Sequence, residues 1–230
     1  MKVAYAVARR VAGLRSAPAL HPGGVMCSGT LDVPGTADGQ WGADWLDRPG
    51  SYEVTVRWSR ALGLPGALPD GLGLALRVAD ADGPGTALDL LLTSSGAGRL
   101  GRHLPLLRRE ALAGPYSTLT SYRTGARERV LAAFPVRGTH PAVDVALPAL
   151  RQALSRAPVR FDLCAAGAGE PWRSFATLTL GAAHAVPERS TLSYDPYAHS
   201  LPGLRPTGWL RRLRQAAYAG SRDGRTPTGP

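Results

Sequence analysis

Cysteine and long apolar runs are scarce in this sequence, and each scarcity excludes a class of protein. Cys27 and Cys164 show neither a CxxC nor a Cys/His spacing, which excludes a thiolate zinc site and a disulfide framework. We expect both thiols to be reduced and buried. No run of about eighteen apolar residues occurs, and Arg9, Arg10 and Arg15 interrupt the segment where a signal peptide needs an apolar stretch. We therefore expect neither a membrane span nor export, and a cytoplasmic location.

Acidic residues are also few, and lysine is nearly absent. The chain has 27 basic against 17 acidic side chains, which gives a net charge of +10, and Lys2 is the only lysine. Six arginines against Asp223 give the segment from Gly203 to the end a charge of +5. This balance attracts anions such as nucleic acid, acidic lipid or a carboxylate-bearing ligand.

The length and composition predict one domain. With 230 residues, of which 44% are hydrophobic and 19% charged, the chain can bury one sizeable core and is not a disordered protein. We take 1–230 as a single domain, with 1–18 as an N-terminal segment and 223–230 as a disordered tail.

Short strands dominate the predicted secondary structure, because 28 glycines and 20 prolines punctuate the chain. Apolar or alternating runs between turn-rich stretches are typical of strands. Six strands are predicted, over Gly24–Leu31, Tyr52–Trp58, Leu72–Val78, Ala87–Thr93, Val159–Ala165 and Ser174–Leu180.

Helical spacing is confined to the middle and the end of the chain. Apolar residues recur three and four apart in RTGARERVLAAF (123–134), in VDVALPALRQALSR (143–156) and in 209–219, which predicts helices there. Strands interrupted by a helical excursion indicate an α+β protein whose antiparallel sheet closes into a β-barrel. Such a barrel can enclose a ligand or hold one at its mouth.

The common catalytic signatures are missing. No GxSxG elbow, P-loop or GxGxxG follows a strand, and no two histidines stand three or four apart as a helical metal site needs. His21 precedes the first predicted strand in His-Pro-Gly-Gly, so its ring either faces a cavity or lies in an exposed turn.

Two further pairs of residues have two interpretations each. Arg57 and Ser59 lie two apart on a predicted strand and share a face, which either meets an anion or faces water. On the C-terminal helix, Arg214 and Tyr218 stand at i and i+4, with Arg222 a further turn on. An arginine lowers the pKa of a neighbouring phenol and makes it a possible ligand for ferric iron. Alternatively, this helix is a basic tail for nucleic acid or an anionic membrane.

Several segments, taken in order, resemble the haem catalase family, and most closely its short, minimal catalase-related members. His21-Pro-Gly-Gly24 with Gly29 resembles the HAKGxxxxGxF segment, and Val56-Arg57-Trp58-Ser59 resembles VRFS. The other matches are Asp70-Gly-Leu-Gly73-Leu-Ala75 with DxxGxA, Ala87-Leu-Asp89-Leu90 with the WDL segment, and Arg214 to Tyr218 with the RxxxY of the proximal helix. The resemblance runs from about residue 20 to 225.

The resemblance implies a catalase-type antiparallel barrel that holds haem b. His21 is then the distal acid and base, and Ser59 orients its imidazole. Arg57 contacts a propionate. Tyr218 is the axial ligand of the iron, supported by Arg214, with Arg222 near a further arginine of the motif.

One departure from the family pattern affects the expected activity. Where catalases place a distal asparagine, this chain has Leu92-Thr93-Ser94-Ser95, so an amide donor is missing and Ser94 is the substitute we consider. Pro18 and Ala219 replace an arginine and a proline of the larger enzymes. We therefore predict a haem-dependent peroxidase that uses hydrogen peroxide or an organic peroxide, with weak or no true catalase activity.

Two alternatives stay open. A haem-dependent tailoring enzyme of a biosynthetic pathway would share every haem residue. A haem-free barrel would instead act as a binding protein through its basic C-terminal segment. We expect no specific nucleic-acid partner. The sequence leaves open whether the chain forms a homo-oligomer.

Overall fold

The computed structural model describes residues 23–36, 41–64, 68–138, 140–184 and 192–207. The predicted site residues His21, Arg214, Tyr218 and Arg222 lie outside these residues, as do the predicted C-terminal helix and both terminal segments.

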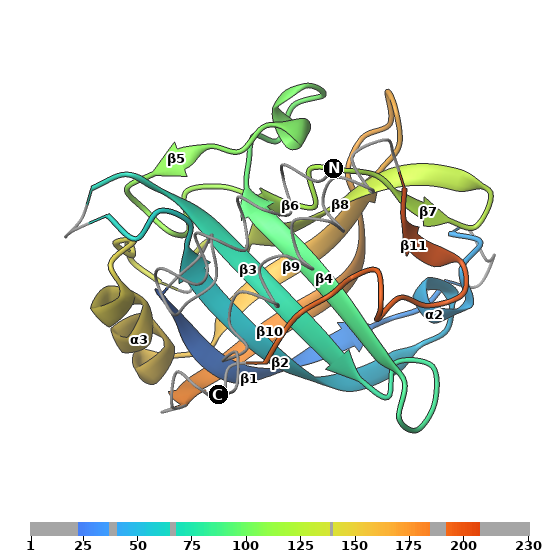
Figure 1. The fold of residues 1–230 in the computed structure, drawn as a ribbon, viewed down its shortest axis with the longest axis horizontal. Helices are drawn as coiled ribbons and strands as arrows, with labels where there is room; N and C mark the ends of the chain where they lie inside the picture. The colour runs from blue at the N-terminus through green and yellow to red at the C-terminus, as the bar shows by residue number, and fades with distance from the viewer. Residues whose placement is uncertain (1–22, 37–40, 65–67, 139, 185–191, 208–230) are drawn as a thin grey trace, which may run out of the picture.

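The architecture is an eight-stranded antiparallel β-barrel with extra short strands and few helices (Figure 1). Its ring is closed because β1 pairs with both β2 and β10, while β8 pairs with both β6 and β9. The barrel strands are β1 (Gly23–Val33), β2 (Gly50–Arg60), β3 (Asp70–Ala79), β4 (Ala87–Ser94), β6 (Tyr116–Ser117), β8 (Arg127–Pro135), β9 (Val159–Ala166) and β10 (Arg173–His184).

Short elements are attached to the barrel. Strand β5 (Leu107–Arg108) pairs with the start of β3, while β7 (Tyr122–Thr124) pairs with β8 and with β11 (Leu204–Pro206). The helices are α2 (Asp44–Asp47), α3 (Leu147–Arg156) and the 3₁₀ turn η1 (Gly101–His103). No helix in the described part of the chain is both long and apolar enough to cross a membrane.

Large side chains fill the centre of the barrel. Trp58, Tyr116 and Phe161 are fully buried and meet edge to face, with ring centroids 5.9 to 6.3 Å apart. The Trp58 Nε1–H donates to Tyr116 Oη at 3.0 Å, and Tyr116 Oη–H donates to the Ala111 carbonyl at 2.7 Å. Both polar atoms are thus satisfied inside an apolar core. These side chains fill the centre of the barrel. We therefore do not place a ligand inside it.

All six predicted strands are confirmed, but one long strand was mistaken for a helix. The segment 123–134, predicted as helical, instead contains the end of β7 and most of β8. Its residues Arg129–Ala133 are all buried, because β8 is covered on both faces, and a strand of this kind loses the alternation that marks a strand in sequence. The other helical prediction, over 143–156, contains α3.

A glycine permits the closure between the first and last strands. The pairing of β1 with β10 shifts register between Cys27 and Gly29. A Cβ at Gly29 would lie 2.4 Å from the Thr179 carbonyl oxygen, so only glycine allows the two backbones to approach this closely.

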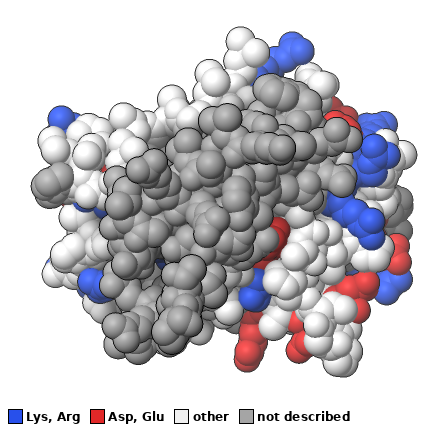
Figure 2. All heavy atoms as spheres, viewed as in Figure 1, with Lys and Arg blue, Asp and Glu red and all other residues white. Residues whose placement is uncertain are grey.

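Figure 2 shows that charged side chains on the viewed face gather mainly along its right-hand side.

Candidate functional site

Arg57 and Ser59 lie on the outer face of β2. The side chains of the intervening residues, Val56 and Trp58, point into the barrel and are fully buried. Arg57 is half-buried, whereas Ser59 is only 3% exposed and donates a long hydrogen bond of 3.4 Å to the Gly73 carbonyl. The predicted shared face is therefore real, and it lies outside the barrel core.

Strand register extends this face across four strands. Because directly paired residues of an antiparallel sheet point to the same side, the partners of Ser59 and Arg57 form two rows. The rows are Gly24, Ser59, Gly73 and Thr93, followed by Met26, Arg57, Ala75 and Leu91. We call these eight residues the outer platform.

Small residues keep the platform shallow. Glycine occupies two of its positions and alanine a third. A Cβ at Gly24 would meet Arg57 Nε, Ser59 Cβ and the Trp58 carbonyl oxygen, each at 3.1 Å. A side chain at this position would press on the two polar groups of the site. The platform therefore combines small residues with a guanidinium and a hydroxyl, which are groups that bind the carboxylates of a flat ligand.

Ser94 is not part of the platform. It points inward from the last position of β4 and is fully buried. Its hydroxyl accepts a hydrogen bond from the Leu72 N–H at 2.9 Å and donates one to the Leu106 carbonyl at 2.7 Å. The preceding residue, Thr93, faces outward and pairs with Gly73, because a shift of one residue along a strand changes the face. The hydroxyl that lies on the platform beside Gly73 is therefore that of Thr93, and not that of Ser94.

The next row along the sheet carries a buried ion pair that the sequence analysis missed. Arg77 on β3 pairs with Asp89 on β4. Its Nε donates to Asp89 Oδ1 at 2.7 Å, and its Nη2 donates to Oδ2 at 2.5 Å. The fully buried Asp89 carboxylate raises the pKa of Arg77 through these hydrogen bonds. The pair is bidentate, which is the strongest form of this interaction.

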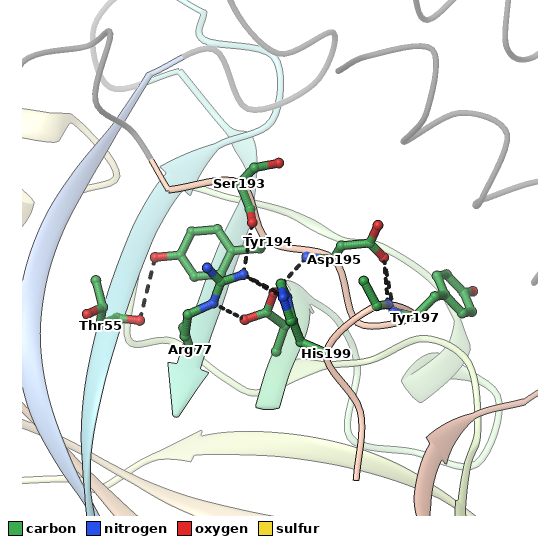
Figure 3. Close-up of polar contacts among 9 residues, drawn as sticks. Thr55, Arg77, Ser193, Tyr194, Asp195, Tyr197 and His199 are labelled. Atoms are coloured by element: carbon green, nitrogen blue, oxygen red, sulfur yellow. Dashed lines mark hydrogen bonds and ion pairs between the residues drawn. The ribbon is translucent and has the colours of Figure 1, made fainter. Parts of the chain in front are cut away.

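This ion pair fastens the segment Ser193–His199, which we call the strap, across the outer face (Figure 3). The Asp195 N–H donates to Asp89 Oδ2 at 2.7 Å, and His199 Nδ1 lies 2.9 Å from the same oxygen. The Asp89 N–H in turn donates to the His199 carbonyl at 3.0 Å. One carboxylate thus organises both ends of the strap.

Tyr194 fastens the strap to the row of residues next to the platform. Its hydroxyl donates to the Thr55 carbonyl at 3.5 Å, and Arg77 Cζ lies 5.6 Å from its ring centroid (Figure 3). Burial raises the pKa of the Tyr194 phenol, and Arg57 is one of the positive charges that oppose this rise. The phenol is therefore neutral at physiological pH, and the strap forms one border of the platform.

A signal for the strap's anchor was present in the sequence. Arg77 and Asp89 are the single charged residues of the predicted strands Leu72–Val78 and Ala87–Thr93, and an isolated charge on an apolar strand needs a partner. The hairpin between them brings them opposite one another. The strap residues themselves carry no periodic pattern that could have placed them.

The described residues contain no group of three or more His, Cys, Asp or Glu side chains that could hold a metal ion.

Comparisons with known proteins test this architecture. No family model matches the sequence, and no curated protein matches it. Solved structures of catalases do match. A bacterial catalase superposes with a TM-score of 0.66 at 14% identity, covering 91% of this chain and 57% of its own. Catalase A from Saccharomyces cerevisiae gives 0.65 at 10% identity, covering 90% of this chain and 60% of its own.

A fungal catalase gives a TM-score of 0.67 at 11% identity, and the match covers 92% of this chain and 59% of that one. The chain thus spans less than two thirds of the length of these catalases, and the identities are low enough that the likeness concerns the fold alone. The superpositions cover about nine tenths of this chain, and the eight-stranded barrel agrees with the predicted architecture. The chain has a catalase-like fold.

Proposed function

We propose that the outer platform binds haem b and that the chain is a haem-dependent, peroxidase-like oxidoreductase acting on hydrogen peroxide or an organic peroxide in the cytoplasm. The observation that carries the proposal is the row Gly24, Ser59 and Gly73 beside Arg57 and Ala75, on the outer face of a catalase-like barrel. A flat macrocycle needs such a surface without protruding side chains. Its carboxylates need a cation, which the Arg57 guanidinium supplies.

The proximal half of the proposed site comes from the family resemblance. Tyr218 would hold the haem iron through its phenolate, and Arg214 would stabilise the phenolate by lowering the pKa of the phenol. Arg222 adds positive charge near the same group. Haem b, when bound, supplies the iron at which a peroxide is reduced.

On the distal side, His21 handles the protons. Its imidazole takes a proton from one peroxide oxygen and returns it to the other, and the Ser59 hydroxyl orients the ring. The chain can reach this place, since His21 stands two residues before Gly23 and two residues span about 7 Å at most. Gly23 pairs with Arg60 and Gly24 pairs with Ser59.

Thr93 replaces an amide by a hydroxyl at the platform's far end. A hydroxyl donates a single hydrogen bond and rotates freely, so it holds a second peroxide less firmly than an amide would. Disproportionation of hydrogen peroxide needs that second molecule. We therefore propose peroxidase-type turnover with weak or no catalase activity.

The test is an absorption spectrum of the full chain purified with ample haem, before and after hydrogen peroxide is added. We expect a Soret band with a high-spin, tyrosinate-type ferric spectrum. Tyr218→Phe should lose most of the haem, whereas the matched control Tyr52→Phe should keep it. No Soret band after haem titration would overturn the proposal and favour the haem-free binding protein.

A second pair of variants tests the distal side. His21→Ala should retain haem but lose its reaction with peroxide, whereas His103→Ala, at an exposed position, should react as the parent does. Equal peroxide reactivity in the His21 variant would remove the acid and base role from this residue.

A further inference from the structure

Two loops at one end of the barrel expose leucine. The loop between β2 and β3 exposes Leu62, Leu64 and Leu68, and the segment from β4 to β5 exposes Leu100, Leu104, Leu106 and Leu107. These seven are all of the large apolar side chains that the described residues expose, and Leu100 reaches 81%. We call them the leucine surface. Monomeric proteins rarely collect exposed apolar side chains in one region without a binding role.

The two loops are joined by strand pairing. Gly71 pairs with Leu107 and Asp70 pairs with Arg108, so β5 lies against the base of the β2–β3 loop. In Figure 1 both lie at the upper left, and the same margin of Figure 2 is largely white. Leu106 and Leu107 therefore lie beside the β2–β3 loop, whereas Leu100 and Leu104 flank η1.

Buried polar groups hold the first loop open. The Asp70 carboxylate, which is fully buried, accepts hydrogen bonds from the backbone N–H groups of Leu62, Gly63 and Leu64 at 2.9 to 3.2 Å. It also pairs with Arg60 at 3.2 Å. This network fixes the loop with its leucines pointing away from the core.

The second loop is anchored in the same way. Ser94 Oγ donates to the Leu106 carbonyl, and the Arg108 guanidinium donates to the carbonyls of Gly114, Ser95 and Pro115. Both loops thus present their leucines from a rigid frame. A surface ordered in advance loses little conformational freedom when it binds.

The charged side chains that are exposed within the two leucine-bearing segments have one sign. Among residues 60–71 and 96–109 the only carboxylate is that of the fully buried Asp70. Arg99 and Arg109 are exposed in the same stretches. Leu107 and Arg109 are two apart in an extended segment and so project to one side. Apolar side chains flanked by arginine, with no exposed acid, complement a bilayer surface with anionic headgroups.

We propose that the leucine surface docks on an anionic lipid bilayer, with the leucines entering the acyl boundary and Arg99 and Arg109 contacting the headgroups. A second copy of the chain fits less well. A symmetric contact would bring these arginines against their own copies, and like charges oppose such a dimer.

The experiment is sedimentation of the full chain with phosphatidylcholine vesicles, with and without phosphatidylserine. We expect binding only with phosphatidylserine, and Leu104→Ser/Leu106→Ser/Leu107→Ser should weaken it by at least about a hundredfold. These side chains are exposed, so the variant should melt as the parent does. Vesicle binding that is unchanged in this variant would overturn the proposal.

A matched pair of charge variants separates location from net charge. Arg99→Gln/Arg109→Gln should weaken binding roughly thirtyfold. Arg123→Gln/Arg205→Gln removes the same charge from exposed cross-strand neighbours on β7 and β11 and should have a much smaller effect. Equal effects of the two pairs would show that charge alone attracts the chain, and would contradict the proposal.

Leu106→Trp gives a readout that does not depend on a loss of binding. Its fluorescence should be quenched by brominated acyl chains in anionic vesicles, beyond any quenching of the parent chain. No additional quenching would contradict insertion of the leucines. Self-association of the parent through the leucines, without vesicle binding, would likewise replace the bilayer by a second copy.

Discussion

The two faces of strands β1 to β4 are built on opposite principles. On β3, the inward residues Leu72, Leu74, Leu76 and Val78 are all at most 1% exposed, whereas the intervening outward residues are Gly73, Ala75 and Arg77. The inner face carries large apolar side chains, whereas the outer face of β3 carries small ones beside Arg77. One strand of ten residues therefore contributes to the core and to the platform at once.

This difference separates stability from ligand binding. The inner face is packed around Trp58, Tyr116 and Phe161, so a change there alters the free energy of unfolding first. The outer platform contributes little packed volume, so a change there should alter ligand binding first. A substitution on either face tests whether the separation holds.

The largest effect is expected inside the barrel. Trp58→Ala should lower the free energy of unfolding by about 3–5 kcal/mol, because it leaves a cavity beside Tyr116 and Phe161. Tyr116 keeps its hydrogen bond to the Ala111 carbonyl, so the loss is mainly one of packing. Urea unfolding measures it. Trp58→Phe, which keeps most of the volume, should cost clearly less, and equal losses in the two variants would contradict a packed interior.

The next effect is expected at the strap's anchor on the outer face. Asp89→Asn removes the charge that partners Arg77 within a buried network, and should lower the free energy of unfolding by about 2–3 kcal/mol. The strap's backbone amides should then exchange hydrogen faster. The control is Asp44→Asn, whose partner Arg48 is 71% exposed, and it should change stability by no more than about 0.5 kcal/mol. Similar losses in the two variants would show that the anchor is no stronger than a surface pair.

How far the sequence predicts this molecule depends on whether a residue's role is local. Alternation in Leu72–Val78 was enough to place a strand and to separate its two faces. The same reasoning put Arg57 and Ser59 together, because residues two apart on a strand must share a face. Strand β8 was not predicted, because it is buried on both faces and so lacks the alternation of apolar and polar residues on which the prediction depends.

Long-range placement was not available from the sequence. Ser94 was considered because the segment 92–95 stands where catalases have a distal asparagine. Only the strand register tells that Thr93, and not Ser94, points outward. The strap is more distant still. Asp89 and Asp195 are 106 residues apart, and no local pattern connects them.

A substitution on the platform should affect haem rather than stability. Ala75→Leu adds a side chain beside Arg57 and should abolish haem retention, while the free energy of unfolding changes by less than about 1 kcal/mol. Ala79→Leu is the matched control, because Ala79 faces outward on the same strand but beyond Arg77. The Soret absorbance per chain measures both. Retention of haem in the Ala75 variant would move the ligand off this face.

The smallest effect concerns the two thiols. Burial raises the pKa of Cys27 to about 12 and that of Cys164 to about 11, so both are protonated at pH 8 and should react with a thiol reagent only on unfolding.

The same shift makes stability depend weakly on pH. An unfolded chain releases these protons near pH 8.5, so the contribution of each neutral thiol is fully present below that value and is lost as pH rises toward 11 or 12. At pH 10 the loss should be about 2 kcal/mol for a thiol, and Cys27→Ala should remove that share of the decline between pH 8 and 10 in urea unfolding. An unchanged decline, or rapid labelling of the folded chain at pH 8, would mean that solvent reaches the inner face of β1. The contrast between a tightly packed interior and an outer platform of small residues would then fail at β1, which contributes to both.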